Sequence, residues 1–167
     1  MKHFVDIADF NTKKLNLIIK TAKQIKKNPK KFANKCKDKT LGMIFQKEST
    51  RTRVSFNVGF KKLGGHSIEL NAESIGFGKR ENYHDIVRTL SQYIDMLMIR
   101  NDDHNIIRNL SSLNALPIIN GLSDFSHPCQ ILSDFLTINE KLGNIKSQSI
   151  CWIGDYNNVL RSLIELQ

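Results

Sequence analysis

Apolar side chains recur along the chain in two alternating patterns, one with the period of a helix and one with the continuous run of a buried strand. Residues 12–27 place Leu15, Ile19 and Ile25 at helical spacing with lysines opposite, which predicts an amphipathic helix with Thr12 as its N-cap. Residues 40–45 (TLGMIF) form an apolar run that is typical of a strand buried on both faces.

The same alternation continues to the end of the chain. Further apolar runs predict strands at residues 66–71, 94–99, 117–120 and 149–153. Helical periodicity follows each strand, at residues 54–63, 82–93, 102–114, 127–142 and 159–167. This order predicts an α/β fold, a parallel sheet with helices on both faces.

The last strand and helix predict the start of a second unit. A parallel strand at 149–153 followed by one short helix would keep an uncovered edge. We therefore expect one α/β domain over residues 1–145, then the first β-α unit of a second α/β domain over residues 146–167, in a chain that is the N-terminal part of a longer protein.

The net charge of +9 comes from one segment, since residues 13–39 hold eleven lysines and one acid, Asp38. This segment has no Arg or Trp for base contacts or stacking, which favours a solvated helix face over a nucleic-acid-binding module. No apolar run approaches the ~18 residues of a membrane span. An odd number of distant cysteines argues against a disulfide scaffold, so we expect a cytoplasmic protein without membrane contact.

Polar residues capable of chemistry follow the predicted strands, where open α/β sheets bind their ligands. Residues 49–53 (STRTR) join three hydroxyls and two guanidiniums to the N-terminus of a predicted helix, a set of donors suited to a phosphate. The alternative is a helix capped by Ser49 or Thr50 that carries surface arginines.

Two later segments add candidates to the same edge. Arg100 follows an apolar strand and would enter the cleft unless it pairs with Asp102 or Asp103. His127 and Gln130 share one helix face and can both bind a carbonyl or an amide, unless His127 is only a cap. Cys129 between them is typical of a packing residue. Residues 154–158 (GDYNN) lack a G-x-G-x-x-G pattern, and no metal-binding cluster stands out, so no cofactor is expected.

Three stretches resemble motifs of one enzyme family. Residues 45–53 (FQKESTRTR) resemble the phosphate motif of the aspartate and ornithine carbamoyltransferases. Residues 126–134 (SHPCQILSD) resemble the HPCQ motif of the ornithine branch, and residues 152–159 (WIGDYNNV) resemble the turn that opens its amino-acid-binding domain. The resemblance runs the full length of the chain.

This resemblance implies an enzyme of arginine biosynthesis that transfers a carbamoyl group from carbamoyl phosphate to the side-chain amine of L-ornithine, giving citrulline and phosphate. It implies no metal or organic cofactor, a homotrimer, and no nucleic-acid or membrane partner. The implied carbamoyl-phosphate-binding residues are Ser49, Thr50, Arg51, Thr52, Arg100, His127, Pro128, Cys129 and Gln130. Arg100, His127 and Gln130 would be catalytic, and Asn158 would bind ornithine.

The resemblance further makes Arg53 a structural arginine and Glu81 the acid that orients Arg51. Gly76 stands where the family often has a polar residue that reaches a neighbouring subunit. Three alternatives remain: a carbamoyltransferase with another acceptor such as aspartate, a non-catalytic fragment that binds a phosphate ligand, and a nucleic-acid-binding module. The first is disfavoured because Cys129 stands where the aspartate branch usually has Thr.

Overall fold

A parallel sheet forms the centre of the computed structural model, which describes residues 2–143 and 145–166. Its strands are β1 (Thr40–Phe45), β2 (His66–Asn71), β3 (Met96–Arg100) and β4 (Ile118–Leu122). They lie in the order β2-β1-β3-β4, and every neighbouring pair is parallel. The predicted α/β class with a parallel sheet is therefore confirmed.

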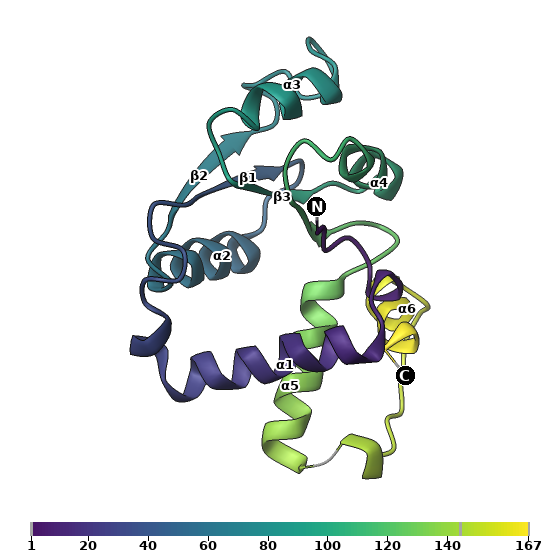
Figure 1. Ribbon diagram of the computed structural model, residues 1–167. Helices are drawn as coiled ribbons and strands as arrows, with labels where there is room; N and C mark the ends of the chain where they lie inside the picture. The colour runs from purple at the N-terminus through teal and green to yellow at the C-terminus, as the bar shows by residue number, and fades with distance from the viewer. Residues whose placement is uncertain (1, 144, 167) are drawn as a thin grey trace.

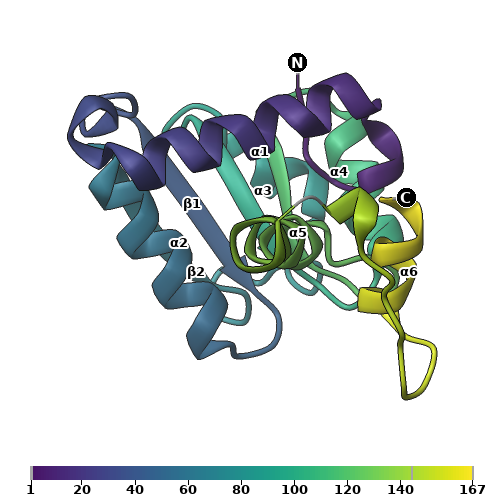
Figure 2. The same cartoon turned by 90° about the horizontal axis from the view of Figure 1, so that it is seen from below.

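Helices cover both faces of this sheet (Figure 1). They are α1 (Thr12–Lys27), α2 (Thr50–Lys62), α3 (Tyr83–Leu90), α4 (His104–Ser112), α5 (Pro128–Leu142) and α6 (Asn158–Glu165), with 3-10 turns at Ile7–Asp9, Pro29–Phe32 and Ile145–Ser147. α3 and α4 lie on one face, and α1, α2 and α5 lie on the other (Figure 2). In the described part of the chain, no helix is long and apolar enough to cross a membrane.

Two-sided burial explains the apolar strands. Met43 and Met98 pack with Phe60 of α2 on one face of the sheet, whereas Ile44 and Ile99 belong to the cluster on the opposite face with α3 and α4. Successive side chains of a strand point to opposite faces, so a strand covered on both sides reads as a continuous apolar run. The predicted bounds of β1 and β2 match the observed ones.

Helix α1 lies against α5 with the apolar side that its periodicity predicts. Leu15 and Ile19 are buried with Leu132 of α5, and all eleven lysines of residues 13–39 are exposed. The helix begins as predicted, but its N-cap is Asn11 rather than Thr12, since the Asn11 side chain accepts a hydrogen bond from Lys14 N at 3.0 Å. Asparagine is the better N-cap because its short side-chain oxygen reaches the free N–H groups readily.

The apolar stripe predicted for α2 differs from the one that is buried. Val54 and Val58 are 53% and 44% exposed, while Phe56 and Phe60 pack against the sheet. Val54 and Val58 are four residues apart, and so are Phe56 and Phe60, so helical spacing alone does not decide which pair faces the sheet. The larger aromatic side chains occupy the buried face.

The fifth predicted strand does not form. Residues 149–153 have no strand conformation, and Ile153 is 93% exposed. A strand is stabilised by hydrogen bonds to a neighbouring strand, and within the described residues none lies beside this segment. Of the predicted β-α unit at residues 146–167, the structure shows the helix, α6, and not the strand.

Candidate functional site

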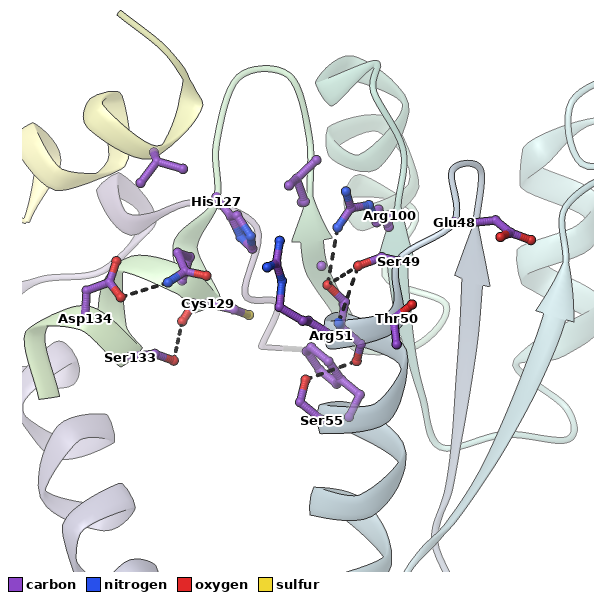
Figure 3. Close-up of a pocket in the computed structure, with 16 residues that line it drawn as sticks. Glu48, Ser49, Thr50, Arg51, Ser55, Arg100, His127, Cys129, Ser133 and Asp134 are labelled. Carbon is purple, nitrogen blue, oxygen red and sulfur yellow. Dashed lines mark hydrogen bonds between the residues drawn. The ribbon is translucent and has the colours of Figure 1, made fainter. Parts of the chain in front are cut away.

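A cleft of about 830 Å³ opens at the carboxyl ends of β3 and β4 (Figure 3). Its walls come from the first turns of α2, the first half of α5 and the start of α6. The lining residues are Glu48, Ser49, Thr50, Arg51, Thr52, Ser55, Phe56, Arg100, Gly121, Leu122, His127, Cys129, Gln130, Ser133, Asp134 and Val159. All the predicted site residues except Pro128 and Asn158 therefore share one cleft.

The N-terminus of α2 forms one wall of this cleft. Ser49 is the N-cap, and its Oγ accepts a hydrogen bond from Thr52 N at 3.4 Å while donating to Thr52 Oγ1 at 3.0 Å. Arg51 is exposed and extends from the helix into the space between α2 and α5 (Figure 3). Capping accounts for Ser49 but not for Arg51, so this wall offers a helix dipole end, hydroxyls and a guanidinium to an anion.

Arg100 enters the cleft from the end of β3. Its Nη1 donates a hydrogen bond to Thr52 Oγ1 at 3.3 Å, and its buried Nε has no partner among the described residues. Asp102 pairs instead with Lys47 at 2.5 Å, and Asp103 caps α4. Within the described chain Arg100 forms no ion pair with a carboxylate, so its charge is available to a ligand.

His127 faces α2 from the N-terminus of α5. It occupies the N-cap position, yet its side chain makes no capping hydrogen bond, and its buried Nδ1 has no partner in the described structure. Burial, and next the positive charge of Arg100, lower the pKa of His127 to about 4. The imidazole is therefore neutral near neutral pH and can donate one N–H to a carbonyl oxygen.

We expect His127 to titrate near pH 4 in the free chain and at a higher pH when inorganic phosphate is bound, because the anion offsets the charge of Arg100. Between pH 6.5, the ordinary pKa of histidine, and about pH 4, the unfolded chain binds a proton at His127 that the folded chain does not. The free energy of unfolding should therefore fall as the pH falls through that range.

NMR titration of the imidazole resonances, assigned with His127→Gln, measures this pKa directly. A pKa near 6.5 for His127 in the free chain would contradict the description of a buried imidazole beside an arginine.

Gln130 is held by an acid to which the sequence analysis assigns no role. Its Nε2 donates to Asp134 Oδ1 at 2.8 Å, one helical turn later. The signal was present, because residues four apart on a helix are neighbours and Asp134 belongs to the matched motif. This contact fixes the amide of Gln130 at the wall of the cleft.

The two residues between His127 and Gln130 differ in placement. Cys129 lines the cleft, donates from Sγ to Asn120 O at 3.5 Å, and has its pKa raised by burial to about 12. A protonated thiol is a poor nucleophile, so Cys129 acts as a packing residue of the wall. Pro128 is buried in the first turn of α5, outside the lining.

Asn158 lies at the start of α6, where its Nδ2 donates to Ser123 O at 2.5 Å, and its neighbour Val159 reaches the cleft instead. The predicted pairing of Glu81 with Arg51 is not present among the described residues, and Glu81 lies 3.9 Å from Arg80 in the loop before α3.

Arg53 behaves as the structural arginine that was predicted. It pairs with Glu69 at 2.9 Å and lies over the ring of Phe45 at 5.2 Å. These contacts join α2 to β1 and β2, which holds the arginine away from the cleft.

The parallel sheet defines an α/β domain, and one cleft at its carboxyl edge gathers hydroxyl, guanidinium and imidazole groups. Residues 2–140 match the family model of the aspartate/ornithine carbamoyltransferase carbamoyl-P binding domain. The chain belongs to the aspartate/ornithine carbamoyltransferase family, as its motifs predict.

Similar proteins cover nearly all of this chain. An ornithine carbamoyltransferase of Pyrococcus abyssi is 46% identical over 160 residues, which are 95% of this chain and 50% of that protein. The structure of the Pyrococcus furiosus ornithine carbamoyltransferase superposes with a TM-score of 0.94 at 43% identity, over 99% of this chain and 53% of that one. The structure of the Thermus thermophilus ornithine carbamoyltransferase superposes with a TM-score of 0.91 at 33% identity, over 98% of this chain and 57% of that one. The chain thus spans about half the length of these relatives.

Proposed function

We propose that this chain supplies the carbamoyl-phosphate half of an ornithine carbamoyltransferase, which forms citrulline and phosphate from L-ornithine and carbamoyl phosphate. The observation that carries the proposal is the cleft itself: Arg51, Arg100 and the N-terminus of α2 face the neutral imidazole of His127. This arrangement suits a molecule with a phosphate at one end and a small carbonyl at the other.

In this proposal the phosphate binds at the α2 wall and the carbamoyl group lies toward α5. Ser49, Thr50, Arg51 and Thr52 hold the phosphate oxygens through N–H, hydroxyl and guanidinium donors. Pro128 shapes the first turn of α5, and Cys129 packs the wall beneath the carbamoyl group.

The reaction needs stabilisation of negative charge rather than a strong base. The neutral amine of ornithine attacks the carbonyl carbon, a C–N bond forms, the C–O bond to phosphate breaks, and the departing phosphate takes the proton. Arg100 and His127 donate to the carbonyl oxygen where charge develops, and one good donor of this kind is worth roughly 2.7–4 kcal/mol. Gln130 would hold the carbamoyl amide, and no group in this scheme requires a metal or organic cofactor.

The remaining parts of the proposal rest on the motif resemblance. Asn158 would contact the α-amino-acid end of ornithine, and residues 146–167 would begin the acceptor-binding unit after a boundary near residue 145. A relative from Pyrococcus furiosus is named an anabolic ornithine carbamoyltransferase, which supports the biosynthetic direction. A cytoplasmic homotrimer is the assembly that we propose for this enzyme.

Calorimetric titration of the 167-residue chain with carbamoyl phosphate and with inorganic phosphate tests the proposed function. We expect both to bind, and carbamoyl phosphate to bind more tightly because it gains the contacts of Arg100, His127 and Gln130. Binding of neither ligand would overturn the assignment of the cleft. Equal affinity for carbamoyl phosphate and inorganic phosphate would overturn the assignment of Arg100, His127 and Gln130 to the carbamoyl group.

A further inference from the structure

The backbone of His127 is held by a different helix. His127 N donates to Ser162 Oγ of α6 at 3.0 Å, and Ser162 is fully buried. The imidazole makes no capping hydrogen bond of its own. The orientation of this side chain in the cleft therefore depends on the backbone at the start of α5. There Ser162 accepts from the N–H of the N-cap residue itself, the bond that a glutamate or glutamine at the N3 position makes in a capping box.

A chain of hydrogen bonds with a fixed direction connects Ser162 to a buried carboxylate. Ser126 Oγ donates to Asp6 Oδ1 at 2.8 Å, which uses its single proton. Ser162 Oγ lies 3.2 Å from Ser126 Oγ and must be the donor in that contact. The order is then His127 N–H to Ser162, Ser162 O–H to Ser126, and Ser126 O–H to Asp6, and such sequential bonds strengthen one another.

The Asp6 carboxylate, at the end of this chain of hydrogen bonds, is ionised. Burial favours the neutral form of Asp6, but the neighbouring Glu165, hydrogen bonds from Ser126 Oγ and Ile7 N and the charge of Arg161 keep its pKa below the ordinary value. Arg161, one residue before Ser162, lies 3.4 Å from Asp6 Oδ2. The chain of hydrogen bonds and this ion pair together hold α6 against the N-terminal segment, beside the start of α5.

We propose that Ser162 is a positioning residue that holds His127 in the orientation needed to bind the carbamoyl group. This inference rests on the proposed function, since it assigns His127 to that group. It also couples the placement of α6, which carries Asn158 at its first position, to the half of the cleft that would recognise the carbonyl.

The test is Ser162→Ala in the 167-residue chain, titrated with carbamoyl phosphate and with inorganic phosphate. We expect carbamoyl phosphate to bind about fivefold more weakly, the size of effect that the loss of one hydrogen bond produces, and inorganic phosphate to bind as before. The amide resonance of His127 should move upfield, as its hydrogen bond is lost, and Ser162→Thr, which keeps the hydroxyl, should restore both readouts. Ser112→Ala is the matched control, because it removes an exposed helical hydroxyl whose hydrogen bond in the described structure is to Asn109 O.

The outcomes separate the two ideas. If the unmodified chain binds neither ligand, the proposed function fails. If His127→Ala weakens carbamoyl phosphate binding and Ser162→Ala does not, only the positioning role is overturned. If Ser162→Ala weakens both ligands equally, or if Ser162→Thr fails to restore binding while remaining folded, the effect is a general loss of structure and the proposal is wrong.

Discussion

Replacing Arg51 with Ala should weaken the binding of carbamoyl phosphate on the order of 100-fold and leave the fold intact. Arg51 is exposed and extends into the cleft, so its removal opens no cavity in the core (Figure 3). A guanidinium can form two charge-assisted hydrogen bonds with a phosphate, and each bond to a charged group contributes about 1.5–3 kcal/mol. Calorimetry with carbamoyl phosphate and with inorganic phosphate should show the loss for both, because this contact is to the phosphate end.

Two controls distinguish a local contact from a general effect of positive charge. Arg80→Ala removes an arginine whose side chain is 75% exposed and that lies outside the cleft. Replacing Lys20 and Lys23 of the basic segment removes two exposed charges from α1. Both variants should bind like the unmodified chain. Unchanged binding by Arg51→Ala would refute the phosphate site.

The 167-residue chain should bind carbamoyl phosphate but form citrulline at a rate thousands of times or more below that of a full-length relative. It spans about half the length of those relatives, and in the structure the predicted acceptor residue Asn158 is bonded to Ser123 O. Holding two reactants at attack distance can be worth ~7–11 kcal/mol, so a site that holds one of them lacks most of that gain.

A citrulline assay with saturating ornithine and carbamoyl phosphate measures this rate, and the cleft should be shown to bind carbamoyl phosphate in the same preparation. Turnover comparable to that of a full-length enzyme would show that this chain holds both reactants by itself. The division of labour that we propose between two halves of the site would then be wrong.

Sequence reasoning succeeded where a residue's surroundings are local. The strand at residues 40–45 could be predicted because an apolar run buried on both faces needs no further information. The wall at Ser49–Thr52 followed from a strand, a turn and a helix start that are adjacent in sequence, and Arg100 followed from the end of the next buried strand.

The failures involve partners that are distant in sequence. Residues 149–153 have the composition of a strand, but in the described part of the chain no strand lies beside them, and composition does not specify a neighbour. Glu81 was assigned to Arg51 by resemblance, whereas the described structure shows no ion pair between the two and has Glu81 3.9 Å from Arg80, the preceding residue. Ser162 gave no signal at all, because its role depends on α6 returning to the start of α5.

The contact between Asp6 and Arg161 also bears on how the chain folds during its synthesis. The two residues are 155 positions apart, and Phe4 pairs with Ile119 at the edge of β4. Forming contacts at such sequence separations requires closing a long loop, which costs conformational entropy before the contacts stabilise the fold. Folding is therefore slower. The N-terminal segment emerges from the ribosome first, yet Asp6 acquires its full set of partners only after α6 has been made. A ribosome-bound chain from which Arg161 has not yet emerged should therefore be more sensitive to proteases than one from which α6 has fully emerged.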